Sequence, residues 1–381
     1  MNVLPYALTA MLLAQATPAA TPGDVAFSKG NFDAAYAAYA MQAAAAPNDE
    51  DAMLGLGTLE LYRGDLSDAR VHLMKAAQLD PRDERPAMRL RALHEMTQRP
   101  GDFSIAMQRD EIQVPFVTTD PLPMIAAKIN GHNVRFVIDT GAPALDLSAT
   151  LIKRLGIPMH AAGQATFAGG KTAPIFAGRA DTVDFPGVRV SGVPIGQIPP
   201  EMPMTMGGRT YDGILGTTFL RQFLATIDYR HGNLILRPRS TSARFEADVR
   251  SHGGSIAAMW LVPDHMIFVR ARVGTHDGLF NIDTGGEGVG IDLSSRSLQE
   301  AKISADTAHA RQFLGGGGAV RVVPFIAPSI AIGTYEQHNV PGITSPEDPH
   351  FPFAVAGRIS HAFFRGAVVT FDFSAMRLII E

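Results

Sequence analysis

The chain has 381 residues, of which 46% are hydrophobic and 18% are charged, and its formal net charge is -4. This composition is typical of folded globular domains, and the length predicts two or three of them. The weakly acidic balance gives no reason to expect a nucleic-acid partner, and the absence of cysteine excludes disulfides, thiolate nucleophiles and cysteine-bound zinc.

The first twenty residues have the composition of an export signal. Residues 3–14 form an apolar stretch of signal-peptide length, and Ala14-Gln15-Ala16 and a segment rich in Pro, Thr and Ala follow it. We therefore expect residues 1–20 to be a signal peptide and the mature protein to be exported to the periplasm. Because the amino terminus is the only positive charge before the apolar stretch, an uncleaved N-terminus that tethers the chain to a membrane is the alternative.

Residues 24–98 carry a short helical repeat. Three residues return 34 positions later, in the pairs Gly30 and Gly64, Ala35 and Ala69, and Pro47 and Pro81. Small residues let helices pack closely and proline ends each unit, so helices are predicted near 31–45, 50–63, 66–79 and 84–97. The segment resembles the tetratricopeptide family, which implies a groove for a protein partner. Since fewer than three repeats are present, a folded spacer is the alternative.

Residues 99–111 are expected to be a linker, and the texture of the sequence changes after them. Short β-type runs separated by Gly and Pro are predicted as strands at 124–129, 134–138, 188–190, 224–229, 234–236, 266–273, 279–282, 368–373 and 378–380. Short helices are predicted at 148–155, 217–222 and 294–300. Many short strands with turns between them indicate a sandwich or a barrel-like β fold.

A second repeat divides the strand-rich part into two halves, 112–245 and 246–381. Phe136-Val-Ile-Asp-Thr-Gly141 returns as Phe280-Asn-Ile-Asp-Thr-Gly285, so Asp139 and Asp283 are 144 residues apart. Further matches follow in order at spacings of 144 or 146: Asp146-Leu147-Ser148 with Asp292-Leu293-Ser294, Phe167 and Gly169-Gly170 with Phe313 and Gly315-Gly316, and Phe219, Arg221, Thr226 and Asp228 with Phe363, Arg365, Thr370 and Asp372. An ordered series of this kind indicates that one lobe has been duplicated.

The two Asp-Thr-Gly motifs resemble the pepsin/retropepsin superfamily of aspartic peptidases, and the texture around them is closer to its bacterial retropepsin-like members. Ile129-Asn130-Gly131-His132 and Asp212-Gly213-Ile214-Leu215-Gly216 carry this likeness. The resemblance implies a bilobal all-β acid-protease fold of duplicated retropepsin-like lobes. With the short all-α tetratricopeptide-like domain before it, the expected fold class is multidomain.

By the same resemblance, Asp139 and Asp283 are the catalytic residues, and Thr140, Gly141, Thr284 and Gly285 support them. The threonine hydroxyls can brace one loop against the other, and glycine lets the two backbones approach. Two carboxyl groups about 3 Å apart share one proton, so the pair can act as base and as acid on a water and a peptide bond.

The expected activity is that of an aspartic endopeptidase acting on a peptide or protein substrate in a cleft between the lobes. No cofactor is required, and no metal is expected because the 12 His have no metal-ligand spacing. Since both halves lie in one chain, a homodimer is not needed to build the site. By resemblance, two Gly-rich hairpins are candidate flaps over the substrate, with ordinary hairpin tips as the alternative; they contain Phe167, Gly169, Gly170, Phe313, Gly315 and Gly316.

The second lobe departs from the family pattern at one element. Ile214-Leu215-Gly216 has Arg358-Ile359-Ser360 as its counterpart, and because this element packs behind the catalytic loop, Ser360 is expected to distort the second lobe or change its pairing. Two alternatives therefore stay open: a non-catalytic peptide-binding or scaffold protein with a degenerate protease fold and a helical-repeat partner site, and lobes that pair with another chain. Of four other acidic residues, Asp228 and Asp372 are read as structural, and Asp146 and Asp292 as turn or capping residues.

Overall fold

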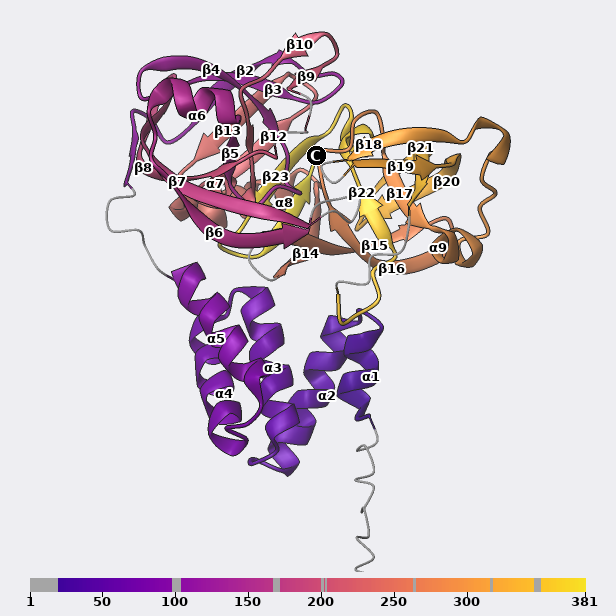
Figure 1. Ribbon diagram of the computed structural model, residues 1–381. Coiled ribbons are helices and arrows are strands. Elements are labelled where there is room, and N and C mark those ends of the chain that lie inside the picture. Colours follow the sequence, from indigo (N-terminus) through magenta and orange to yellow (C-terminus); the bar gives the residue numbers. More distant parts are fainter. Residues whose placement is uncertain are drawn as a thin grey trace, which may run out of the picture.

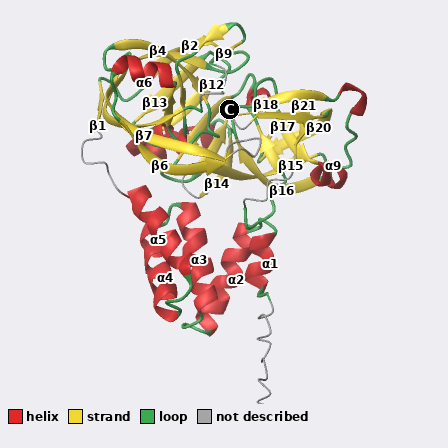
Figure 2. Cartoon of the chain, in the orientation of Figure 1, coloured by secondary structure: helices red, strands yellow, loops and turns green. Residues whose placement is uncertain are grey.

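The computed structural model describes residues 20–97, 104–166, 172–199, 202, 204–262, 265–315, 318–345 and 351–381. A helical domain is followed by a strand-rich part that is divided into two lobes (Figures 1 and 2). The expected order of an all-α domain and a bilobal all-β part is thereby confirmed. Of the expected signal peptide, only Ala20 lies within the described residues. Within the same ranges, no helix combines the length and the apolarity that crossing a membrane requires.

The helical domain consists of α1 (Pro22–Ser28), α2 (Phe32–Ala45), α3 (Glu50–Arg63), α4 (Leu66–Leu79) and α5 (Glu84–Thr97). The last four match the predicted helices to within one residue. The sequence analysis missed α1, which has 7 residues. It begins with a capping box in which the Asp24 amide donates to the Thr21 hydroxyl (3.1 Å) and the Thr21 amide donates to the Asp24 carboxylate (2.9 Å).

The small residues of the helical repeat allow adjacent helices to touch. A Cβ atom placed on Gly57 would lie 2.7 Å from Cγ of Leu73, so glycine is needed where α3 meets α4. The ring of Tyr39 lies against both Gly23 and Gly55, where an added Cβ would collide with it. These contacts bind α1, α2, α3 and α4 into one compact layer.

The helical domain and the second lobe share a buried aromatic cluster. Phe32 of α2 packs edge-on against Phe353 and Trp260, with ring centroids 4.9 Å and 5.5 Å away. Tyr62 of α3 and Phe268 of the second lobe belong to the same buried cluster. The Ala354 amide also donates a hydrogen bond to the Ser28 carbonyl (2.8 Å). The helices are therefore packed onto the second lobe, below it in Figure 1.

The first lobe contains β2 (Ile112–Thr118), β3 (Met124–Ile129), β4 (His132–Ile138), β5 (Leu145–Leu147), α6 (Ala149–Leu155), β6 (Met159–Thr166), β7 (Thr172–Phe185), β8 (Val188–Gln197), β9 (Thr205–Met206), β10 (Arg209–Thr210), β11 (Gly213–Leu215), α7 (Thr217–Leu220), β12 (Leu224–Asp228) and β13 (Asn233–Arg237). Part of the segment expected as a linker is strand β1 (Ser104–Met107), which pairs with β8.

The second lobe follows α8 (Ser242–Ser251). It contains β14 (Ser255–Val262), β15 (Met266–Val273), β16 (His276–Ile282), β17 (Ile291–Ser294), α9 (Ser295–Glu300), β18 (Arg311–Gly315), β19 (Gly318–Val322), β20 (Pro324–Ile332), β21 (Tyr335–Ser345), β22 (Gly357–Ile359), β23 (Val368–Asp372) and β24 (Arg377–Ile380). Apart from the two-stranded sheets β9–β10 and β18–β19, the strands of the two lobes join into one closed hydrogen-bonded network.

The duplication seen in the sequence is repeated in the strand pairing. In the first lobe β11 runs parallel to β4 and antiparallel to β5, and in the second lobe β22 runs parallel to β16 and antiparallel to β17. Equivalent residues occupy equivalent registers, since Ile214 pairs with Val137 and Arg358 pairs with Asn281. Two strands that end in the Asp-Thr-Gly motifs are thus held in the same way.

A sheet of six antiparallel strands crosses the boundary between the lobes, in the order β2, β13, β12, β23, β24 and β14. Its two central strands carry Thr226 and Thr370, which are opposite each other in the register. Their buried hydroxyls are 2.7 Å apart and hydrogen-bond to each other. This sheet fixes the two lobes relative to each other within a single chain.

Two of the residues predicted to be turn or capping residues have another position. Asp146 and Asp292 lie within strands β5 and β17. The helix caps are the serines that follow two residues later: Ser148 accepts from the Leu151 amide (3.2 Å) and Ser294 accepts from the Ser297 amide (3.1 Å). The repeated Asp-Leu-Ser triplet is therefore the end of a strand followed by a helix cap.

Candidate active site

Asp139 and Asp283 follow directly after the last residues of β4 and β16. The Asp139 amide donates to the Leu215 carbonyl (3.2 Å), and the Asp283 amide donates to the Ile359 carbonyl (3.0 Å). Each carboxylate accepts a hydrogen bond from the glycine amide two residues later, at 2.8 Å from Gly141 and 3.0 Å from Gly285. Both motifs therefore form the same turn, which holds the carboxyl group against its own backbone.

The two threonines of the motifs brace the two loops reciprocally. The Thr140 amide donates to the Thr284 hydroxyl (3.0 Å), and the Thr284 amide donates to the Thr140 hydroxyl (3.1 Å). Each hydroxyl then donates to a carbonyl of the other lobe, at Ile282 (2.9 Å) and Ile138 (3.4 Å). Both threonines are fully buried, so these hydrogen bonds have no competition from water. The loops cannot separate without breaking these four hydrogen bonds.

The two glycines allow the carboxyl groups to meet. A Cβ atom on Gly141 would lie 2.5 Å from the carboxyl carbon of Asp283, and one on Gly285 would collide with the Asp139 carboxyl group. With hydrogen atoms at these positions, the carboxyl groups of Asp139 and Asp283 approach closely enough to hydrogen-bond to each other. The structure therefore brings together all six residues that the two motifs predict for the site.

The environment of the pair favours one shared proton. Burial raises the pKa of Asp139 well above its ordinary value, and the negative charge of Asp283 and the hydrogen bond between the two carboxyl groups raise it further. Burial and the charge of Asp139 also raise the pKa of Tyr211, to about 12, and the pKa of Tyr229 rises for the same two reasons. Both tyrosines are therefore neutral beside the pair at any ordinary pH, and one carboxyl group stays protonated to a higher pH than an isolated aspartate would.

The expected distortion of the second lobe at Ser360 is wrong. In the first lobe a Cβ on Gly216 would collide with the carbonyl oxygens of Ala142 and Ala144. The corresponding loop of the second lobe is two residues longer, and there the Ser360 hydroxyl accepts from the Gly286 amide (2.9 Å) and donates to the Asp283 carbonyl. Serine is thus accommodated by the longer loop and fastens it. In the first lobe Thr217 has a similar role, because its hydroxyl donates to the Thr140 carbonyl (2.8 Å).

A cation beside the pair was not anticipated from the sequence. Nη1 of Arg358 lies 3.1 Å from Oδ2 of Asp283. The sequence marked Arg358 only as a departure from the apolar element that packs behind the loop. The signal available in the sequence was the charged residue that stands 144 positions after the aliphatic Ile214. Equivalent positions of the two lobes have the same neighbours, so a different residue type there is unusual.

Two antiparallel strand pairs border the segments predicted to be flaps. In the first lobe β6 and β7 pair as far as Thr166 and Thr172, and Phe167, Gly169 and Gly170 lie outside the described residues. In the second lobe β18 and β19 pair from Arg311 to Gly315, so the backbone of Phe313 and Gly315 is in the hairpin, and Gly316 lies outside the described residues. Their role as flaps stays a prediction.

Asp228 and Asp372, which the sequence predicts to be structural, fasten the turns that follow β12 and β23. Asp228 accepts from the His231 amide (2.8 Å), and Asp372 accepts from the amides of Ser374 (2.9 Å) and Ala375 (3.1 Å). Asp146 is buried, which raises its pKa to about 6. Across the described ranges, no group of three or more His, Asp or Glu side chains could hold a metal ion.

Comparisons with known proteins agree with this site. Residues 125–219, which cover most of the first lobe and its Asp-Thr-Gly loop, match the family model described as "Aspartyl protease". No curated protein matches the sequence.

Among solved structures, a retropepsin-like aspartic protease from Rickettsia conorii matches with 19% identity and a TM-score of 0.28, over 36% of this chain and 95% of that one. Basic 7S globulin from soybean matches with 11% identity and a TM-score of 0.42, over 73% of this chain and 95% of that one. The chain is thus similar to aspartyl proteases over residues 125–219, which contain the first Asp-Thr-Gly loop, and its second lobe repeats that loop.

Proposed function

We propose that the chain is an aspartic endopeptidase in which Asp139 and Asp283 activate a water molecule for attack on a peptide bond. The observation that carries the proposal is the close approach of the two carboxyl groups, each of which lies against the glycine of the other motif, held by the reciprocal threonine brace. A structural pair of aspartates would have no need of such an approach, because placing two carboxyl groups together costs free energy unless a proton is shared.

The chemistry follows from the shared proton. The ionised carboxyl group takes a proton from a water while the water oxygen bonds to the carbonyl carbon of the substrate, and the protonated one gives its proton to the carbonyl oxygen. In the second step a proton passes to the leaving amine as the C–N bond breaks. The fixed positions of both carboxyl groups reduce the reorganisation that each proton transfer requires.

The test is cleavage of a peptide library by the purified full-length protein across a pH series, with products identified by mass spectrometry. We expect cleavage that is strongest at acidic pH, that is blocked by inhibitors carrying a hydroxyl group in place of the scissile bond, and that resists chelators. The Asp139→Ala protein is the control for contaminating peptidases. Binding of peptides without cleavage at any pH would contradict the proposal and identify the chain as a non-catalytic peptide binder.

We also propose that the chain is exported, on the basis of the apolar stretch and small residues in positions 3–16. N-terminal sequencing of the protein recovered from a periplasmic fraction should then begin near Thr17 or Thr21. Recovery of soluble cytoplasmic material that keeps Met1 would exclude the periplasmic location, and membrane-bound material that keeps Met1 would identify a tether.

A further inference from the structure

Arg358 is held beside the carboxyl pair by the sheet. It lies at the centre of β22, where it pairs with Asn281 of β16 and Asp292 of β17. Its Nη1 atom is 3.1 Å from Oδ2 of Asp283, and the side chains of Arg358 and Asp283 are 36% and 15% exposed. A guanidinium group is ionised at every pH at which a protein stays folded. Asp283 therefore has a permanent positive charge at hydrogen-bonding distance.

The first lobe has an apolar residue at the equivalent position. Ile214 pairs with Val137 as Arg358 pairs with Asn281, and it is buried in a cluster that includes Tyr211 and Leu122. Asp139 accepts from the Gly141 amide as Asp283 accepts from the Gly285 amide, so the two turns are otherwise alike. The charge next to Asp283 is thus the principal difference between the surroundings of the two carboxyl groups.

Other titratable and charged groups also surround the pair. Tyr211 and Tyr229, on the side of the first lobe, are neutral because burial and the charge of Asp139 raise their pKa values. His361, whose ring packs against Tyr229, has its pKa lowered by burial, which disfavours its charged form. Glu287 lies near Tyr211, and Asp292 and Arg296 line the same pocket as Arg358. Arg358 donates a hydrogen bond from Nη1 to the Asp283 carboxylate (3.1 Å).

We propose that Arg358 is a positioning residue that assigns the roles within the pair: Asp283 carries the negative charge and Asp139 carries the proton. This assignment rests on the proposed peptidase function. Asp283 then takes the proton of the attacking water as the water oxygen bonds to the carbonyl carbon, and Asp139 gives its proton to the carbonyl oxygen, which yields a tetrahedral diol. As the C–N bond breaks, Asp283 returns its proton to the amine nitrogen, and a diol hydroxyl returns one to Asp139.

The raised pKa of Asp139 agrees with this assignment, since burial and the negative charge of Asp283 are its main causes. Arg358 also acts on the pair as a whole. A fixed positive charge favours the state with one negative charge over the neutral state, and the state with two negative charges over that with one. Both apparent pKa values of the pair, and with them both limbs of the pH profile, are therefore lowered by Arg358.

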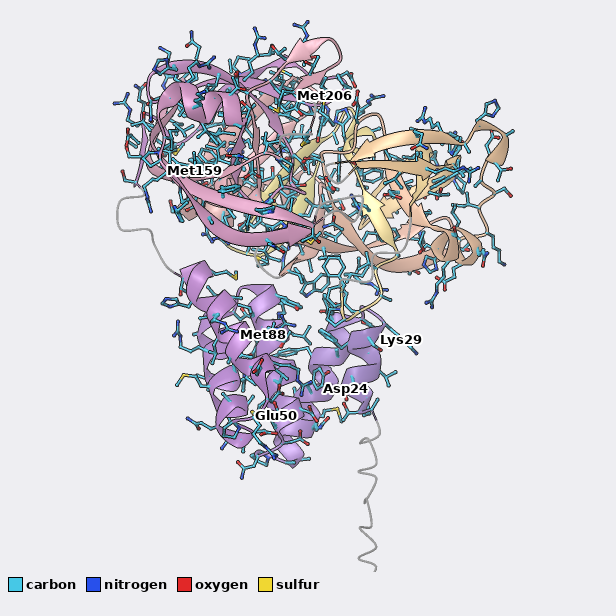
Figure 3. The ribbon with its side chains drawn as sticks, viewed as in Figure 1. Asp24, Lys29, Glu50, Met88, Met159 and Met206 are labelled. Carbon is cyan, nitrogen blue, oxygen red and sulfur yellow. The ribbon has the colours of Figure 1, made fainter. Side chains whose placement is uncertain are left out.

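The experiment compares the pH dependence of kcat/KM for the full-length protein, Arg358→Ile, Arg358→Gln and Arg358→Lys. Arg358 lines a pocket of about 460 Å³, which also reaches Lys29 of the helical domain, labelled in Figure 3, so shorter side chains leave no sealed core cavity. Arg358→Ile places the aliphatic type of residue found in the first lobe at this position. Both limbs of the pH profile should then move upward by about one pH unit. This value is at the lower end of the range for a charge at this distance, because the arginine is partly exposed. Arg358→Lys should return them most of the way.

Arg272→Ile is the matched control, because Arg272 is an exposed residue of β15 in the same lobe and its loss changes the net charge equally. Its pH profile should coincide with that of the unaltered protein. Identical limbs in Arg358→Ile and in the unaltered protein would reduce Arg358 to a structural residue and overturn the proposal.

A second measurement does not depend on turnover. Titration of ¹³C-labelled aspartate carboxyl groups by NMR, assigned with Asp139→Asn and Asp283→Asn, reports which member of the pair ionises first. We expect Asp283 to ionise first in the unaltered protein and the order to weaken or reverse in Arg358→Gln. Ionisation of Asp139 before Asp283 would overturn the assignment. Absence of peptide cleavage with the expected titration order would instead contradict the proposed function and leave the electrostatic role of Arg358 established.

Discussion

Thr140 and Thr284 are bound to each other by two hydrogen bonds that are mirror images, since each amide donates to the other's hydroxyl. Replacing Thr140 by valine removes one hydroxyl and leaves the Thr284 amide and the Ile282 carbonyl buried without a partner. We expect Thr140→Val to lower the free energy of unfolding by about 2–6 kcal/mol, since each of the two unsatisfied buried groups costs about 1–3 kcal/mol. Urea unfolding measures it. Thr140→Ser keeps the hydroxyl and is the control. If Thr140→Val and Thr140→Ser were equally stable, the brace would contribute nothing to the free energy of unfolding.

Both carboxyl groups are required as a unit. Asp139→Asn and Asp283→Asn should each abolish nearly all peptide cleavage, because either change leaves no pair that holds one proton and one charge. The double variant should be scarcely slower than either single variant, since residues that act together are strongly non-additive. Rates of cleavage of one peptide by the three proteins test this. Substantial turnover by Asp283→Asn would show that Asp139 builds a site without the second lobe.

The shared proton should also be visible in the stability of the fold. The pKa of Asp139 is raised in the folded state, so protonation of this group stabilises the folded protein below its unfolded pKa, and this contribution is lost as the pH rises through the raised value. Each unit between the two pKa values is worth about 1.4 kcal/mol. Asp139→Asn removes the titrating group, so its free energy of unfolding should exceed that of the unaltered protein above the raised pKa. Urea unfolding at several pH values measures the free energy of unfolding of both proteins. If the free energies of the two proteins changed with pH in the same way, the prediction would be contradicted.

Ser360 fastens the catalytic loop of the second lobe through its hydroxyl. Ser360→Ala and Ser360→Gly should both lower the free energy of unfolding, by about 1 kcal/mol, because the half-buried Gly286 amide loses its acceptor. Glycine is the residue of the first lobe at this position, but it should bring no recovery, since the longer loop of the second lobe needs the hydroxyl. Ser251→Ala, an exposed serine of α8, is the control. A stabilised Ser360→Gly would mean that the serine strains the loop.

The helical domain should unfold together with the second lobe. Phe32 is 1% exposed in the aromatic cluster shared with Trp260 and Phe353, so Phe32→Ala should lower the free energy of unfolding by about 3–5 kcal/mol. Val71→Ala, in which the replaced side chain is 64% exposed on α4, should change it little. Thermal unfolding followed by circular dichroism and by Trp260 fluorescence should give coincident transitions. Helices that melt at a lower temperature than the tryptophan signal would indicate a separately folded spacer.

Features of the chain that repeat at a fixed spacing could be predicted from the sequence. The 144-residue spacing located both catalytic loops, and the 34-residue spacing located α2, α3, α4 and α5. Such spacings can be read from the sequence alone, because the helices and loops that they describe are held mainly by residues close to them. The sequence also predicted that Thr140 and Thr284 brace the two Asp-Thr-Gly loops. When a motif packs against its own copy, identical side chains lie on both sides of the boundary between them.

Features that depend on register or on docking could not be predicted. Strand β7 extends from Thr172 to Phe185, although Pro174 and Gly178, residue types that strands disfavour, interrupt the sequence there. Phe32, Trp260 and Phe353 are separate apolar residues whose meeting depends on how the helices pack on the second lobe. The contact of Arg358 with Asp283 likewise requires the parallel register of β22 and β16. The sequence indicated an unusual residue at position 358, and only the fold gives it a partner.

The presence of both lobes in one polypeptide has a consequence for symmetry. Where two identical subunits build an active site on a two-fold axis, every side chain occurs twice, and an arginine beside one aspartate would stand beside the other as well. A two-fold axis allows a contact between identical residues, such as that between Thr226 and Thr370 in the central sheet. It does not allow different residues at equivalent positions, such as Ile214 and Arg358. Fusion of the two halves therefore frees this chain to treat its two aspartates differently, while the strands beneath them keep the same architecture.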